Sequence, residues 1–181
     1  GSEMCIRDRK LAGNSAVTKG QRELIQKLLH DFPDAAELFE YEDYCKTPTL
    51  GTASAFIGMA LDANIHEIDS ESGYMQYIAT RPRVQKHGSH GLFSSATAVD
   101  LTSAMSELEA HEGNVWTIIY SLRREDAARL EYDSADAWRT LLMENAPTLA
   151  KSMKISLDNF HWYAAFHDEG HHPHIHMMVW S

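Results

Sequence analysis

The residue types best suited to chemistry are the histidines near the end of the chain. Five of the chain's 11 histidines lie within residues 167–176. His174 and His176 are two positions apart, so an extended strand would point both imidazoles to the same face. His167 closes the aromatic-rich segment 159–167, which is typical of a strand. If these two strands are antiparallel neighbours joined by a short connection, the three imidazoles meet on one face of a sheet.

Three converging imidazoles predict a metal site. Nitrogen ligands suit manganese, zinc, nickel, cobalt or iron better than magnesium or calcium, which prefer oxygen. Three protein ligands also leave coordination positions open, as in catalytic centres. The alternative is a solvated loop or an adventitious metal binder. The apolar stretch 175–179 around the pair argues against it, because uncompensated polar groups are costly to bury. His171 and His172 are expected in the connection and not among the ligands.

A metal beside tyrosines and basic residues indicates phosphoryl transfer. Residues 74–80 are rich in aromatic and β-branched side chains, and we expect them to form a strand that ends before Pro82. Tyr74 and Tyr77 would then face opposite sides of this strand. A phenol with an ordinary pKa near ~10 needs a base or a nearby positive charge to attack a phosphate. Packing in the core is the alternative role for either tyrosine.

The remaining pattern predicts the elements that hold these residues. Helices are expected at residues 24–32, 34–44, 52–68, 101–108, 124–130 and 134–153, the last with a kink or break at Pro147. A further strand is expected at 114–122, and a loop at 82–95. Four strands interleaved with helices indicate an α+β fold, in which helices cover one side of a largely antiparallel sheet. This sheet domain, residues 73–181, would follow an N-terminal helical segment, residues 13–72, and a non-native leader, residues 1–12.

Composition narrows the class of protein. The chain has 181 residues, of which 44% are hydrophobic, and no apolar run approaches the ~18 residues of a membrane helix. Cys5 and Cys45 provide no disulfide framework, so we expect a cytoplasmic protein. A formal net charge of -10 argues against nucleic acid as a partner. However, the basic clusters at 81–86 and 123–124 still permit modest, salt-sensitive DNA binding.

Several of these segments resemble a known family. Residues 167–176 are similar to the third motif of HUH relaxases, the DNA-nicking enzymes of plasmid mobilisation and conjugation, in which two histidines flank one hydrophobic residue. The spacing of His167 from the pair resembles that of mobilisation relaxases with an upstream histidine as third ligand. Five further segments narrow the resemblance to the MobL relaxases of bacterial mobile elements; they are residues 77–83, 90–93, 114–117, 121–127 and 162–167.

The resemblance implies a five-stranded antiparallel sheet with the metal site on its central strands. It also implies site- and strand-specific nicking of single-stranded DNA at an origin of transfer, by transesterification through a covalent phosphotyrosine. The partners would be that DNA, accessory proteins of the relaxosome and a coupling protein, in the bacterial cytoplasm. His167, His174 and His176 would hold manganese or magnesium, with zinc, nickel or cobalt as alternatives.

The same resemblance assigns roles to other residues. Tyr77 would be the nucleophile, because it opens a Tyr-Ile pair like that of some relaxases; Tyr74, His87 and His90 are the alternatives. Positively charged side chains would contact DNA phosphates or form surface ion pairs; these are Arg81, Arg83, Lys86, Arg123 and Arg124. Asp168 and Glu169 would orient a ligand imidazole or cap the connection.

Other functions remain open. A rolling-circle replication initiator or a transposase would carry the same histidine motif, and a non-catalytic metal-binding and DNA-binding remnant is a further possibility. Cupin-type proteins need more ligands after the histidine pair, and the HExxH motif of metalloproteases is absent. Relaxases usually carry the nucleophile near the N-terminus and continue past the histidines. We therefore expect a fragment cut at both ends, with a catalytic domain that is incomplete after Ser181.

Overall fold

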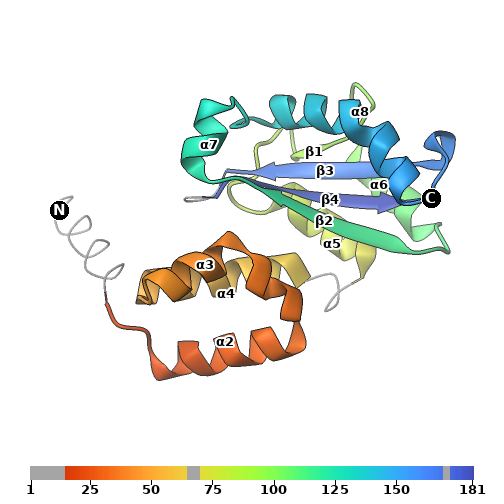
Figure 1. Ribbon diagram of the computed structural model, residues 1–181. Helices are drawn as coiled ribbons and strands as arrows, with labels where there is room; N and C mark the ends of the chain where they lie inside the picture. Colours follow the sequence, from red (N-terminus) through yellow and green to blue (C-terminus); the bar gives the residue numbers. More distant parts are fainter. Residues whose placement is uncertain (1–14, 65–69, 169–171) are drawn as a thin grey trace. The chain divides into compact units, whose positions relative to one another are not determined.

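The chain divides into two compact units, Gly1–Ile68 and Asp69–Ser181. The structure is a computed structural model that describes residues 15–64, 70–168 and 172–181. The expected leader, residues 1–12, lies outside the described residues. The described part contains seven α-helices and one four-stranded antiparallel sheet, which confirms the expected α+β class (Figure 1). None of its helices is long and apolar enough to cross a lipid bilayer.

The first unit is a small helical assembly. It comprises α2 (Lys19–Asp31), the 3-10 helix η1 (Pro33–Glu37), α3 (Phe39–Lys46) and α4 (Leu50–Asn64). Helix α2 begins with a capping box between Thr18 and Gln21. Ile25, Leu28 and Phe56 form the centre of its core. The single helix expected at 34–44 is wrong, because the extended backbone of Leu38 separates η1 from α3.

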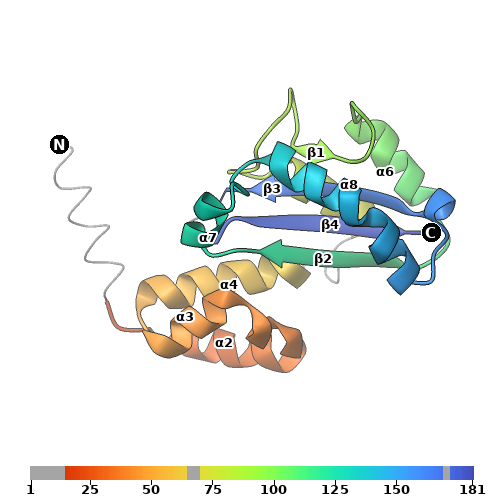
Figure 2. The same ribbon diagram turned by 45° about the horizontal axis from the view of Figure 1, so that its top comes forward.

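The second unit is built on the sheet. Its strands are β1 (Leu92–Phe93), β2 (Val115–Ser121), β3 (His161–His167) and β4 (His174–Trp180). Their order is β1-β3-β4-β2, and all neighbours are antiparallel, as Figure 2 shows. The described residues therefore form four strands, whereas the resemblance implied five. The two histidine-bearing strands occupy the centre, as expected.

Helices lie on both faces of the sheet, whereas the sequence indicated one. Helix α8 (Ala135–Ser152) begins at the N-cap Ser134 and packs on the face that carries Trp162, Phe166 and Ile175. It runs through Pro147 without a break. Helices α5 (Glu71–Thr80) and α6 (Leu101–Glu109) lie on the opposite face, which carries the histidines; the short α7 (Arg124–Arg129) and the 3-10 helix η3 (Leu157–Asn159) complete the unit.

The strand expected at 74–80 is wrong, because these residues belong to helix α5. Ser70 caps the helix by accepting a hydrogen bond from the Gly73 amide. The buried positions are 74, 75, 78 and 79, which is the spacing of a helix face rather than of a strand. Strand β1 instead lies within the expected loop 82–95. Tyr74 and Tyr77 are consequently three residues apart on a helix and do not face opposite sides of a sheet.

Candidate metal centre

Strands β3 and β4 bring the three predicted histidines together. His167 lies directly opposite His174 in the antiparallel register, and His176 is opposite Ala165 one step further along. One ring nitrogen from each imidazole forms a group in which all three atoms lie within 4.8 Å of one another. All three side chains are fully buried. The alternation of a strand thus explains how this sequence gathers three imidazoles on one face.

In each imidazole one ring nitrogen has no hydrogen-bond partner; we call it the inner nitrogen, and the hydrogen-bonded one the outer nitrogen. The inner nitrogens are Nδ1 of His167, Nε2 of His174 and Nε2 of His176. The outer nitrogens are bonded: His167 Nε2 donates to the Ile78 carbonyl (2.8 Å), and His174 Nδ1 donates to the His172 carbonyl (3.1 Å). Because a carbonyl only accepts, both inner nitrogens must carry lone pairs. A buried group of such lone pairs fits a metal ion, since buried polar atoms otherwise cost free energy.

Their surroundings favour the neutral forms of His167 and His176. Burial, followed by the charges of His174 and Arg81, lowers the pKa of His167 to about 3. Burial likewise lowers the pKa of His176 well below its ordinary value, with the other two histidines and Arg81 as further causes. A metal binds the neutral form of imidazole, so protons compete little for the site at neutral pH.

Helix α5 contributes two of the contacts behind the imidazoles. The Tyr74 hydroxyl is 3.0 Å from His176 Nδ1, and the Ile78 carbonyl accepts from His167. In a continuing helix that carbonyl would bond the amide of residue 82, but residue 82 is a proline and has none. The proline after α5 therefore leaves a main-chain acceptor for His167.

Tyr77 and Arg81 lie together at the end of the same helix. The Arg81 guanidinium carbon is 5.3 Å from the centre of the Tyr77 ring, which is cation–π geometry. Tyr77 is partly exposed, whereas Tyr74 is 1% exposed. Since Arg81 also lowers the pKa of His167 and His176, its charge is within range of the histidine cluster.

The other basic residues occupy the turns beside the cluster. Arg83 has a φ of 72°, a left-handed conformation that turns the chain after α5, and its carbonyl accepts from the Asp168 amide. Arg124 pairs with Asp168 at 2.7 Å. Asp168 was expected to orient a ligand imidazole or to cap the connection. Its carboxylate pairs with Arg124, and the outer nitrogens of the three imidazoles bond Tyr74, the Ile78 carbonyl and the His172 carbonyl. Lys86 is exposed, and Arg123 is the N-cap residue of α7.

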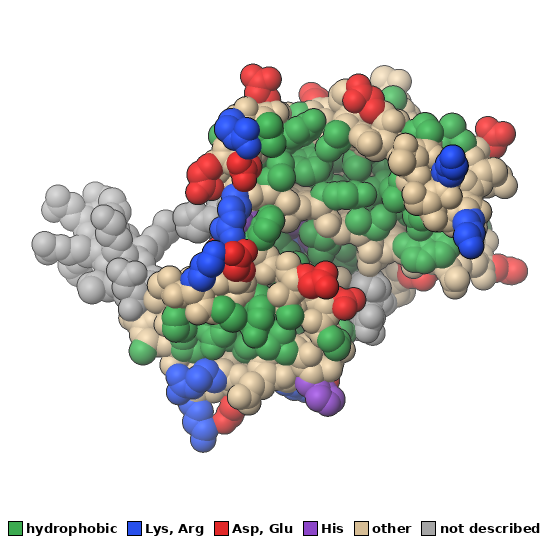
Figure 3. Space-filling model, in the orientation of Figure 1, with side chains coloured by type: hydrophobic (Ala, Val, Ile, Leu, Met, Phe, Trp, Pro, Cys, Tyr) green, Lys and Arg blue, Asp and Glu red, His purple; other side chains and the backbone are tan. Residues whose placement is uncertain are grey.

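The charges on this side of the unit are mixed. Figure 3 shows Lys and Arg side chains next to Asp and Glu along the edge of the sheet unit that carries α7. Arg129 pairs with Asp126 there, in addition to the pair between Arg124 and Asp168. The described basic residues therefore do not make a continuous basic patch on this edge. Glu169 and His171 lie outside the described residues.

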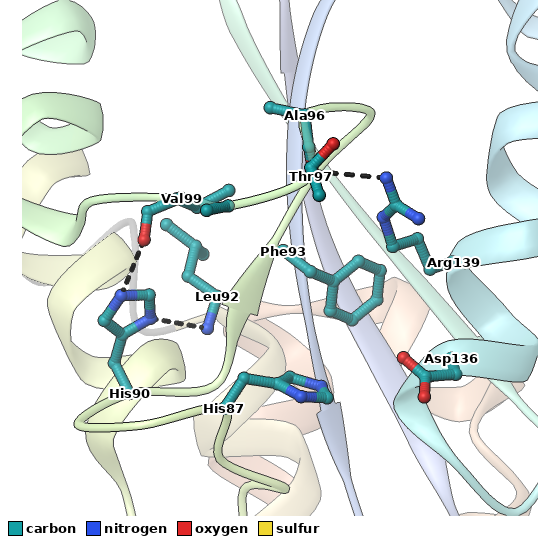
Figure 4. Close-up of a pocket in the computed structure, with 10 residues that line it drawn as sticks. His87, His90, Leu92, Phe93, Ala96, Thr97, Val99, Asp136 and Arg139 are labelled. Atoms are coloured by element: carbon teal, nitrogen blue, oxygen red, sulfur yellow. Dashed lines mark hydrogen bonds between the residues drawn. The ribbon is translucent and has the colours of Figure 1, made fainter.

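His87 and His90 line a separate cavity of about 240 Å³ at the β1 edge (Figure 4). His90 is buried, and both of its ring nitrogens are bonded: Nδ1 accepts from the Leu92 amide and Nε2 donates to the Val99 carbonyl. His87 is exposed and points into the cavity, toward Asp136. Arg139 closes one wall by donating to the carbonyls of residues 94–96. Neither histidine belongs to the three-imidazole cluster.

Ser121 lies beside the cluster, although the sequence indicated no individual role for it. It lies opposite His174 on β2, so the row 167, 174 and 121 crosses three strands on one face. Its hydroxyl oxygen is buried without a hydrogen-bond partner. Tyr74 and the Ile78 carbonyl were also missed as contacts behind the imidazoles. The helical spacing of residues 74–79, Ser70 as N-cap and Pro82 after the end were the available signals.

The fold and the cluster together define an α+β protein with a three-histidine site suited to a divalent metal. The chain belongs to the MobL relaxase family, which matches it over residues 4–181. MobL relaxases are conjugative DNA relaxases, so membership implies an enzyme that binds DNA. Among curated proteins and solved structures, none matches the chain.

Proposed function

We propose that this chain nicks one DNA strand at an origin of transfer, by a metal-dependent transesterification in which Tyr77 is the nucleophile. The observation that carries the proposal is the arrangement around helix α5. The helix contacts the three-histidine cluster at Tyr74 and Ile78, and it presents Tyr77 beside Arg81. The segment that carries a phenol and a fixed positive charge is thus the one that contacts the proposed metal site.

The cluster supports His167, His174 and His176 as the metal ligands. One ring nitrogen of each is buried without a hydrogen bond, and one ring nitrogen from each lies within 4.8 Å of the other two. A divalent metal held there would act as a Lewis acid that neutralises charge on the oxygens of the scissile phosphate. Manganese is the metal we propose, since three imidazoles suit it better than magnesium.

The exposure and bonding of the rival residues favour Tyr77 as the nucleophile. Tyr74 is 1% exposed and hydrogen-bonded to His176. His90 uses both ring nitrogens for main-chain contacts, and His87 lines the cavity at the β1 edge. Tyr77 is partly exposed, so its side chain, unlike that of Tyr74, can be reached from solvent.

Arg81 would activate Tyr77. A guanidinium beside a phenol stabilises the charged form of the phenol, which is the nucleophile. The Tyr77 oxygen then forms a bond to phosphorus while the bond from phosphorus to the leaving sugar oxygen breaks. The phenol loses its proton to solvent, and the sugar oxygen gains one and leaves as a hydroxyl. One phosphodiester replaces another, so the reverse reaction rejoins the strand.

Other side chains would hold the DNA strand. Ser121 would donate its unpartnered hydroxyl to an oxygen of the scissile phosphate. Arg83 and Lys86 are exposed in the connection after α5, and they would contact neighbouring phosphates. Arg123 and Arg124 would do so from the start of α7. Such contacts position the strand without reading its sequence, and they weaken as salt rises.

The test is covalent capture of the strand. Labelled single-stranded DNA that carries the transfer origin is incubated with the protein and Mn²⁺, and we expect an adduct that survives denaturation. Tyr77→Phe should abolish the adduct. Tyr120→Phe is the matched control, since it removes a half-buried phenol from the opposite face of the same sheet and should retain the adduct. An undiminished adduct in Tyr77→Phe would exclude Tyr77, and no adduct from the wild type with any divalent metal would refute the nicking proposal.

A further inference from the structure

The geometry points to Tyr74 as a positioning residue of the metal centre, whose phenol oxygen accepts a hydrogen bond from His176 Nδ1 and so stabilises the tautomer in which Nε2 is the metal-binding nitrogen. This inference rests on the proposed metal site. It assigns the two tyrosines of α5 different roles, because Tyr77 attacks the phosphate while Tyr74 acts only through His176.

The argument begins with what each acceptor permits. The carbonyls of Ile78 and His172 accept hydrogen bonds and cannot donate them. They therefore fix the protons of His167 and His174 on the outer nitrogens. A hydroxyl can either donate or accept, so the phenol alone would allow both tautomers of His176. Among the three ligands, only His176 depends on a side chain for its tautomer.

The other tautomer of His176 would prevent this residue from binding the metal through Nε2. If the phenol donated to Nδ1, the His176 proton would lie on Nε2 and would point an N–H at the other two imidazoles. A protonated nitrogen has no lone pair for a metal. The outer partner of a ligand histidine generally controls this choice, and its loss costs about 10- to 100-fold in metal affinity.

Packing holds the Tyr74 hydroxyl in its place. The Tyr74 ring is 1% exposed and meets the His176 ring edge to face, with centroids 6.2 Å apart and planes at 80°. Its neighbours Met75, Ile78 and Ala79 on α5 are all fully buried. Tyr74 and Ile78 are one helical turn apart, so a single helix fixes the outer contacts of both His176 and His167.

The same geometry separates Tyr74 from the chemistry. Its oxygen bonds the outer nitrogen of His176, whereas the metal would bind the inner nitrogen of that ring. The Tyr74 side chain is 1% exposed, so a phosphate in solvent does not reach this oxygen. Tyr74 is therefore a contact behind the ligand and not a second nucleophile.

The first test is metal affinity without DNA. Calorimetric titration of Tyr74→Phe with Mn²⁺ or Co²⁺ should give a dissociation constant about 10- to 100-fold higher than that of the wild type. Tyr120→Phe, which removes a hydroxyl on the opposite face of the sheet from the imidazoles, should bind the metal as the wild type does. An unchanged affinity in a folded Tyr74→Phe protein would overturn the inference.

The second test needs no variant. Nitrogen-15 NMR of the histidines in the metal-free wild type reports which ring nitrogen carries the proton. We expect His176 to be protonated at Nδ1, like His174, whereas His167 is protonated at Nε2. A His176 protonated at Nε2 would overturn the inference even if Tyr74→Phe failed to fold. Neither test uses DNA cleavage, so a protein that passes both and forms no adduct refutes the nicking proposal alone.

Discussion

Metal binding should stabilise the sheet unit against heat, and the size of the effect follows from the structure. An ion that binds only the folded cluster adds about 2.7 kcal/mol at 100 times its dissociation constant. The unit Asp69–Ser181 has about 110 residues, and unfolding entropy near 60 °C is about 2.1 cal/mol/K per residue. The entropy is then about 0.24 kcal/mol/K, and the melting temperature should rise by about 11 °C.

Tryptophan fluorescence isolates this unit. All four tryptophans of the chain belong to it; they are Trp116, Trp138, Trp162 and Trp180. Melting curves are recorded with Mn²⁺ and after removal of metal with a chelator. The rise of about 11 °C should vanish in His174→Ala, which removes one inner nitrogen, and persist in His87→Ala, which removes an exposed imidazole. A transition that does not move with metal, or that moves equally in His174→Ala, would refute a metal site at this cluster.

Three further predictions concern single side chains. Ser121→Ala should leave Mn²⁺ affinity unchanged but slow adduct formation about 10-fold, the cost of one hydrogen bond to a charged group; a normal rate would exclude the phosphate contact. Pro82→Ala supplies an amide that competes with His167 for the Ile78 carbonyl, so calorimetry should show Mn²⁺ binding several-fold weaker, whereas wild-type affinity would exclude this role of the proline. Burial and the hydrogen bond to Glu107 raise the pKa of Tyr163 to about 12. Its contribution to stability is therefore present below pH ~10 and is lost as pH rises through 12; in Tyr163→Phe the alkaline loss of stability should be smaller, and an absorbance titration should show one phenol fewer ionising near pH 12.

The histidine site could be predicted from the sequence because its information is local. A strand alternates faces, so His174 and His176 had to share one, and a short connection placed His167 beside them. The family resemblance rested on the same residues and on segments spread along the chain. The comparison with MobL relaxases over residues 4–181 confirms it.

The contacts behind the imidazoles were hidden for a physical reason. A short apolar segment such as 74–80 suits a strand or a helix, and its β-branched and aromatic residues favoured the wrong choice. A helix on the histidine-bearing face of the sheet buries Tyr74, Met75, Ile78 and Ala79 together. The Ile78 carbonyl is a main-chain atom, which no side-chain pattern reveals.

The placement of Ser121 depended on register. The strand expected at 114–122 matches β2 to within one residue at each end, but only the pairing with β4 puts position 121 opposite His174. A shift of one residue would turn that hydroxyl to the other face of the sheet. Pairing partners far apart along the chain are set by the whole fold, so this residue could not be inferred from its neighbours.

Helix α5 makes the metal centre and the proposed nucleophile mechanically inseparable. Residues 74 and 78 contact His176 and His167, and residues 77 and 81 of the same segment are the proposed nucleophile and its proposed activating charge. Inserting one residue between Tyr77 and Ile78 would rotate the two halves of this set by about 100° relative to each other. Loading with metal and alignment of the phenol would then fail together. Metal binding and the position of the Tyr77 phenol thus depend on the same helical register.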